Sequence, residues 1–202
     1  MQPQNIAYAE VINVNRDAFI KKLLEVCVFL KVEPSWLMIA IKIESGFNRK
    51  AYNKVSRATG LIQWIPRYAA PFLKVGTDPK RIVNTIMAMS GIEQLELIRV
   101  FLAPYRGRMT DQYQTYLAIF SPNALGKPES FIIGKRHDPG HKGKAYEWNK
   151  YLDTKFGNKD GKITLFDIKA FVNHHTPAKY RTIQPKITNH ARQTCKFCGQ
   201  PI

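Results

Sequence analysis

Glu44 is the residue of this chain best placed for proton transfer, because it ends an apolar run in the stretch LMIAIKIESGFNRKAYNKVSRATGLIQWIP, residues 37–66. Leu37, Ile41 and Glu44 follow one another at helical spacing, so they share one face of a predicted helix. A carboxyl group at the rim of a core loses hydration, which raises its pKa. Such an acid keeps its proton near neutral pH and can donate it to a leaving oxygen. The alternative is that Glu44 ends the apolar face and points to water.

The sequence around Glu44 favours its interpretation as a proton donor over that of a residue that points to water. Residues 32–66, VEPSWLMIAIKIESGFNRKAYNKVSRATGLIQWIP, resemble the catalytic core of lytic transglycosylases with the lysozyme-like fold, most closely the versions carried by bacteriophages. The matching pattern is a Glu-Ser pair, an apolar residue, an alanine and a Gly-Leu-Ile-Gln segment. In this chain these are Glu44-Ser45, Phe47, Ala51 and Gly60-Leu61-Ile62-Gln63. The resemblance continues through DQYQTYLAIFSPNALGKPES and covers about residues 16–130.

The resemblance assigns roles to individual residues. It makes Glu44 the general acid and later the general base, Ser45 a residue that holds its neighbours in place, and Gln63 a sugar contact. The substrate-binding residues that it implies are Ser45, Gly60, Leu61, Ile62, Gln63, Tyr116 and Phe120. The family usually has a Tyr-Asn pair where this chain has Phe120-Ser121, so a phenolic hydroxyl is missing there. Tyr116 lies one helical turn earlier and either supplies that hydroxyl or is a packed aromatic residue.

A single catalytic carboxylate is what the resemblance implies. Standard glycoside hydrolases use two carboxylates. In lytic transglycosylases the 6-hydroxyl of the muramoyl residue attacks its own C1 and closes a 1,6-anhydro ring. Asp111, Glu93 and Glu96 fall on predicted helices, where charged residues usually face solvent. A hydrolase of the lysozyme type, with a water held by one of these three and the same Glu44, is the alternative enzyme.

The charge balance indicates a polyanionic neighbour. The 202 residues include 31 Lys and Arg against 15 Asp and Glu, a formal charge of +16. Nucleic acid, an acidic membrane face and an anionic cell-wall polymer all fit this charge. Nucleic acid ranks last, because no recognised nucleic-acid motif appears and the charge is spread along the chain. We therefore expect peptidoglycan glycan strands as the partner and no specific nucleic acid.

The expected location follows from what the N-terminal sequence lacks. MQPQNIAYAEVINVNRDAF has no basic stretch followed by an apolar core, and no apolar run is long enough to span a bilayer. With the phage-like motif, this predicts a virion-associated or lysis protein that reaches the bacterial cell wall or periplasm without its own signal peptide. Other virion proteins are then candidate partners. A non-catalytic wall-binding or virion structural protein is the competing hypothesis, and the Phe120 substitution favours it.

The predicted elements are mainly α-helical, as a lysozyme-like domain over residues 1–130 requires. Periodicity and stop signals predict helices at residues 16–32, 34–44, 79–89, 91–103 and 110–120. Pro34 suits a first helical position. Ser90 and Thr110 are expected as N-caps of the last two helices.

The C-terminal part is expected as a linker, 131–144, followed by a helical unit resembling a calcium-binding EF-hand over 145–175. In GNKDGKITLFDI, Gly161 takes the position of the turn glycine. The calcium ligands would be Asn158, Asp160, Thr164 and Asp167. The first ligand position falls on Phe156, so Asp153 serves only if the loop carries extra residues. The alternatives are a structural calcium site with an altered start and a decayed loop that retains its packing.

A basic tail, residues 176–202, closes the chain with CKFCGQPI. Cys195 and Cys198 resemble one knuckle of a zinc ribbon, with His190, or His174 and His175, as candidate further ligands. The alternatives are a reduced surface pair without metal and a docking segment. Three cysteines do not form a disulfide framework, and no cofactor is expected for catalysis.

Overall fold

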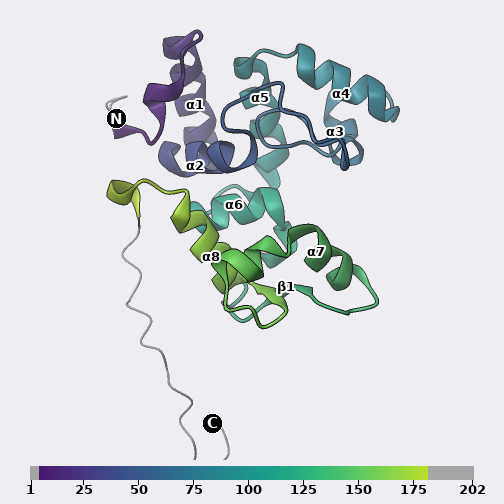
Figure 1. Cartoon of the computed structure of the whole chain (residues 1–202). Helices are drawn as coiled ribbons and strands as arrows, with labels where there is room; N and C mark the ends of the chain where they lie inside the picture. The colour runs from purple at the N-terminus through teal and green to yellow at the C-terminus, as the bar shows by residue number, and fades with distance from the viewer. Residues whose placement is uncertain (1–4, 182–202) are drawn as a thin grey trace, which may run out of the picture.

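The computed structural model describes residues 5–181 of the chain, and these are mainly helical, as the sequence predicts (Figure 1). The larger elements are α1 (Arg16–Leu30), α2 (Pro34–Ser45), α3 (Pro66–Leu73), α4 (Pro79–Ala88), α5 (Gly91–Leu102), α6 (Gln112–Phe120), β1 (Ile132–Lys135), α7 (His141–Asn149), a π-helical turn η5 (Leu152–Phe156), β2 (Lys162–Thr164) and α8 (Leu165–His174). Short 3-10 turns are η2 (Ala9–Val11), η3 (Ala103–Tyr105), η4 (Pro122–Ala124) and η6 (Ala178–Tyr180).

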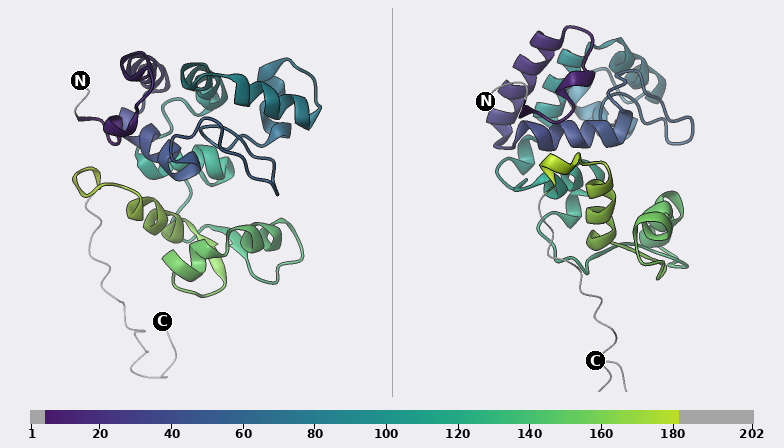
Figure 2. Two further views of the ribbon diagram at one scale, coloured as in Figure 1. Left: turned by 45° about the horizontal axis from the view of Figure 1, so that its top comes forward. Right: turned by 60° about the vertical axis from the view of Figure 1, so that its left-hand side comes forward.

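Helix α2 is the element that carries Glu44, and it lies across the middle of the molecule (Figure 2). It begins with Pro34, as predicted, and ends where Gly46 adopts a left-handed φ of 58° and donates its N–H to the Lys42 carbonyl. Leu37 and Ile41 are fully buried. The apolar face of α2 packs against α6, while α1 packs against α5.

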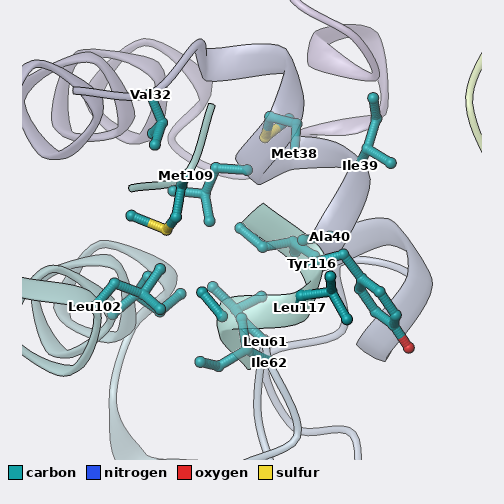
Figure 3. Packing of buried hydrophobic residues seen from close by; sticks show 14 of the residues in the cluster. Val32, Met38, Ile39, Ala40, Leu61, Ile62, Leu102, Met109, Tyr116 and Leu117 are labelled. Atoms are coloured by element: carbon teal, nitrogen blue, oxygen red, sulfur yellow. The ribbon is translucent and has the colours of Figure 1, made fainter. Parts of the chain in front are cut away.

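The core between α2 and α6 also takes in the segment that follows Gly60 (Figure 3). Met38 and Ala40 of α2, Leu117 of α6, and the side chains of Leu61 and Ile62 are all buried there. The chain after Gly60 is therefore a part of the core as well as a connecting loop.

The predicted caps have different outcomes. Ser90 caps α5 in a capping box with Glu93, so that prediction is confirmed. The prediction of Thr110 as the cap of α6 is wrong. Asp111 caps this helix, because its Oδ1 accepts the Gln114 N–H at 2.7 Å.

The C-terminal unit, which runs from β1 to α8, packs directly onto helices α2 and α6. Residues 131–144, expected as a linker, contain β1 and the start of α7, and β1 pairs with β2 in antiparallel orientation. Helix α8 lies against α6 and α2, and the Tyr113 hydroxyl donates to Asn173 Oδ1 at 2.7 Å. The Tyr8 hydroxyl donates to the His175 carbonyl, which ties the N-terminal segment to the same unit.

Two other expectations concern membrane-spanning helices and the predicted zinc ligands. Within residues 5–181 no helix combines the length and the apolar character needed to cross a membrane. Cys195, Cys198 and His190 lie outside the described residues, so the zinc site stays a prediction.

Candidate active site

Glu44 lies half-buried in the last turn of α2. Burial raises its pKa from 4.5 to about 8, and a side-chain hydrogen bond with Tyr116 acts in the opposite direction. The net result is a carboxyl group that holds its proton at neutral pH. This is the protonation state that a general acid requires.

Tyr116 is the side chain that faces Glu44 from α6. Its ring is 2% exposed and stacks on Phe120, with ring centroids 5.5 Å apart and planes inclined by 12°. Burial, followed by the charge of Glu44, raises the pKa of the Tyr116 hydroxyl well above its usual range. The two sequence alternatives for Tyr116 therefore coexist, since its ring is packed while its hydroxyl interacts with Glu44.

A second tyrosine, Tyr151, comes to this place from the C-terminal unit. Its ring meets Phe171 edge-on at 5.6 Å, and Phe171 in turn contacts the Tyr116 ring at 5.9 Å. Burial and then the charge of Glu44 raise the pKa of Tyr151. No sequence pattern identifies Tyr151, because it lies outside residues 1–130 and reaches this place only through the packing of the C-terminal unit.

Ser45 connects α2 to the segment after Gly60. Its hydroxyl donates to the Leu61 carbonyl at 2.9 Å and lies 3.2 Å from the Ile41 carbonyl. The side chains of Leu61 and Ile62 are buried in the core, so these two residues face any substrate only through their backbone. Ser45 thus holds its neighbours in place, which is the role that the resemblance implies.

Gln94 of α5 anchors the same segment from the other side. Its Oε1 accepts the Leu61 N–H at 2.8 Å, while its Nε2 donates to the carbonyls of Arg49, at 2.8 Å, and Ile86, at 3.0 Å. Gly60, with φ at 83°, leaves room for this amide, since a Cβ there would lie 2.6 Å from Gln94 Oε1. Sequence reasoning missed Gln94, because one buried glutamine in an amphipathic helix resembles any polar residue.

Gln63 closes the turn that follows Gly60. It is half-buried with a positive φ of 51°, and its Nε2 lies 3.2 Å from the Gly60 carbonyl and 3.4 Å from the Ala51 carbonyl. These contacts fold the amide back over its own loop. Its predicted role as a sugar contact stays a prediction.

The other three carboxylates have structural partners. Glu93 caps the first turn of α5, Asp111 caps α6, and Glu96 pairs with Arg99 and Lys22. The pKa of Glu93 and the pKa of Glu96 are both lowered, the first by Ser90 and the second by Arg99. All three carboxylates are therefore engaged in helix caps or ion pairs.

Two surface grooves are lined by residues of α1 and of the start of α2. One groove follows α1 past Ile20, Leu24 and Val28, and another lies at the corner between α1 and α2 near Trp36. Glu44 lines neither of them. Its candidacy rests on burial, on its protonation state and on the two tyrosines.

The predicted calcium ligands are placed around the turn at Gly161, and several already have hydrogen-bond partners. Asn158 Oδ1 accepts the Asp160 N–H at 3.2 Å, Asp160 Oδ1 accepts the Lys162 N–H at 2.9 Å, and the Thr164 hydroxyl donates to Asp167. Within residues 5–181, no group of three or more His, Cys, Asp or Glu side chains is arranged as a metal site.

Comparison with known protein families gives a match over the part of the chain that contains Glu44. Residues 29–93 match a family model described as the transglycosylase SLT domain. The matched range runs from the end of α1 to the start of α5 and includes Glu44 and the Gly60–Gln63 segment. A search of curated proteins found no match. The predicted resemblance to the lytic transglycosylase family is thus confirmed over residues 29–93.

Proposed function

We propose that this protein is a lytic transglycosylase acting on peptidoglycan, as the match of residues 29–93 to the transglycosylase SLT domain indicates, and that Glu44 is its general acid. The bond to be cleaved is the one that joins the muramoyl to the glucosaminyl unit. The observation that carries the proposal is the raised pKa of Glu44, about 8, beside the buried Tyr116 hydroxyl. A carboxyl group with that pKa supplies a proton at neutral pH.

The same side chain serves both halves of the reaction. Glu44 first donates its proton to the glycosidic oxygen, which leaves with both electrons of the C1–O bond. The resulting Glu44 carboxylate then takes the proton of the muramoyl 6-hydroxyl while that oxygen bonds to C1. The product is a 1,6-anhydromuramoyl end, and Glu44 is protonated again. No second carboxylate is needed, in contrast to standard glycoside hydrolases.

Tyr116 supports the charged intermediate state of Glu44. Its hydrogen bond favours the ionised carboxylate, which exists only between the two proton transfers. This side chain supplies a hydroxyl that the family pattern places at the position of Phe120. The Phe120 ring, stacked on Tyr116, then has a packing role. The substitution therefore does not argue against catalysis.

The second part of the proposal concerns how the protein reaches the cell wall. The formal charge of +16 suits anionic wall polymers, and the phage-like motif favours a virion-associated or lysis protein. Other virion proteins would then be its carriers. Proteomic detection of this chain in purified phage particles tests the idea, and its appearance only in host lysate would leave the lysis role.

The decisive experiment is mass spectrometry of muropeptides released from purified peptidoglycan. We compare the wild type, Glu44→Gln and a control, Glu93→Gln, which alters an exposed helix cap. We expect anhydromuramoyl products from the wild type and the control, and none from Glu44→Gln.

Two other results would change the proposal. Reducing ends from the wild type would mean a hydrolase with the same acid. No release by any form, where a known muramidase works, would leave a wall-binding or virion structural protein.

A further inference from the structure

Two aspartates are buried in the C-terminal unit, apart from the chemistry of Glu44. Asp153 is 0% exposed in the π-helical turn η5, and Asp167 is 1% exposed in the first turn of α8. A buried carboxylate without full hydrogen bonding is costly, and native proteins rarely keep one without a reason.

Each aspartate uses one oxygen and leaves the other without a hydrogen-bond partner. Asp153 Oδ2 accepts the Tyr146 hydroxyl at 2.8 Å and the Gly161 N–H at 3.1 Å. Asp167 Oδ2 accepts the N–H and the hydroxyl of Thr164, at 2.7 and 2.8 Å. Among the described residues, no donor reaches the buried Oδ1 of Asp153 or the buried Oδ1 of Asp167.

Gly157 lies between the Asp167 carboxylate and the backbone of Asp153. A Cβ on Gly157 would lie 2.1 Å from Asp167 Oδ1 and 3.0 Å from the Cα of Asp153. The φ of Gly157 is −101°, which any residue can adopt, so the demand for glycine here is one of space.

The nearby cationic side chains do not bind the free Oδ1 atoms of Asp153 and Asp167. The Arg136 guanidinium is 3.9 Å from Asp153 Oδ2, which is the oxygen that already accepts hydrogen bonds. The same guanidinium donates to the Tyr146 hydroxyl at 2.8 Å. Lys162 pairs with Asp160 at 3.7 Å. A hard divalent cation, which prefers carboxylate and carbonyl oxygens, would supply the missing charge and the missing contacts.

We propose that Asp153 and Asp167 bind a calcium ion through their free Oδ1 atoms, with carbonyl oxygens of residues 157–162 and water completing the coordination. Calcium suits the site better than magnesium, because it accepts irregular sets of six to eight oxygens. Two carboxylates with carbonyls and water are enough for calcium, so a cluster of three acidic side chains is not required.

This set differs from the one that sequence spacing suggests. Spacing places the first ligand on Phe156, whose ring instead packs on Phe171 at 5.0 Å. The π-helical turn shifts the ligand position back to Asp153, whose Oδ2 accepts the N–H of the turn glycine, Gly161. Thr164 uses its hydroxyl to cap α8, and Asn158 is exposed.

The test uses the full chain, stripped of metal with a chelator. Calcium binding is followed by calorimetry and by competition with terbium, whose luminescence is excited through Tyr146, the ring bonded to Asp153. We expect a dissociation constant on the order of 10⁻⁴ M and a rise in Tm with calcium. Asp153→Asn and Asp167→Asn should each weaken binding by about tenfold or more.

Asp138→Asn is the matched control, since this aspartate lies in the same unit and accepts the Gly140 N–H. Its calcium affinity should stay that of the wild type. Far-UV circular dichroism checks that each variant folds, and the wild type compared in chelator and in calcium gives a result that needs no variant. No heat and no Tm change for the wild type would overturn the proposal. So would equal stabilisation by magnesium, or an equal loss of affinity in Asp138→Asn.

Discussion

Replacing Glu44 by glutamine should make the folded protein more stable at neutral and mildly alkaline pH, even though it removes the proposed catalytic acid. The folded protein holds Glu44 in surroundings that disfavour its charged form, and burial raises its pKa from 4.5 to about 8. Glutamine has nearly the same shape and can keep a hydrogen bond with Tyr116, but it cannot ionise. The substitution therefore isolates the free energy attached to the charge.

The sign and size follow from proton linkage. Between pH 4.5 and 8 the folded wild type keeps a proton that the unfolded chain has released, so its stability falls as pH rises. At about 1.36 kcal/mol per pKa unit, the fall reaches about 3 kcal/mol by pH 7. Because Glu44 is only half-buried, solvent reduces this, and we expect about 2 kcal/mol. Below pH 4.5 the two proteins should be equally stable.

Urea unfolding at several pH values from 4.5 to 8, followed by tryptophan fluorescence, measures the difference. Glu93→Gln is the control with the opposite sign, since Ser90 lowers the pKa of Glu93 and its charge favours folding above pH 4.5. Parallel stability curves for the wild type and Glu44→Gln would refute the reasoning. They would mean that Glu44 titrates as an ordinary exposed carboxylate and is no proton donor at neutral pH.

Two further substitutions test the groups around Glu44. Tyr116→Phe removes a hydrogen bond that favours the ionised acid, so the alkaline limb of the pH–rate profile should move to higher pH and kcat should fall about tenfold or more. Tyr113→Phe, which loses a bond to Asn173, should leave that limb in place, and an unmoved limb in Tyr116→Phe would contradict the proposal. Gln94→Leu strips partners from three main-chain groups and should cost about 3 kcal/mol in urea unfolding. A loss below 1 kcal/mol, about the net worth of one hydrogen bond, would mean that Gln94 does not anchor the segment.

The sequence was most informative where local physics decides the structure. The apolar spacing of Leu37 and Ile41 and the proline at position 34 predicted α2 to within one residue of its end. Ser90 was found as a cap because a capping box depends on residues only three apart. Thr110 and Asp111 are adjacent and both suit an N-cap, so composition alone could not separate them.

The parts that were missed depend on contacts between distant residues. Strand β1 has four residues and exists because β2 pairs with it, so no alternating pattern marked it. Gln94 differs from a solvent-facing glutamine only through the carbonyls and the N–H that surround it in the fold. Leu61 and Ile62 belong to the motif that resembles the family, but their side chains fill the core. A motif thus identifies a segment without saying which of its atoms face the substrate.

Aromatic contacts join the C-terminal unit to the neighbourhood of Glu44, so this unit packs against the candidate site. From Tyr116 on α6 the contacts run to Phe171 on α8 and on to Tyr151, which precedes η5. Asp153 lies two residues after Tyr151 on that same turn. An ion that fixes η5 would therefore also fix Tyr151, whose pKa responds to the charge of Glu44. The unit for which the sequence suggests calcium binding thus contacts the aromatic side chains that lie beside Glu44.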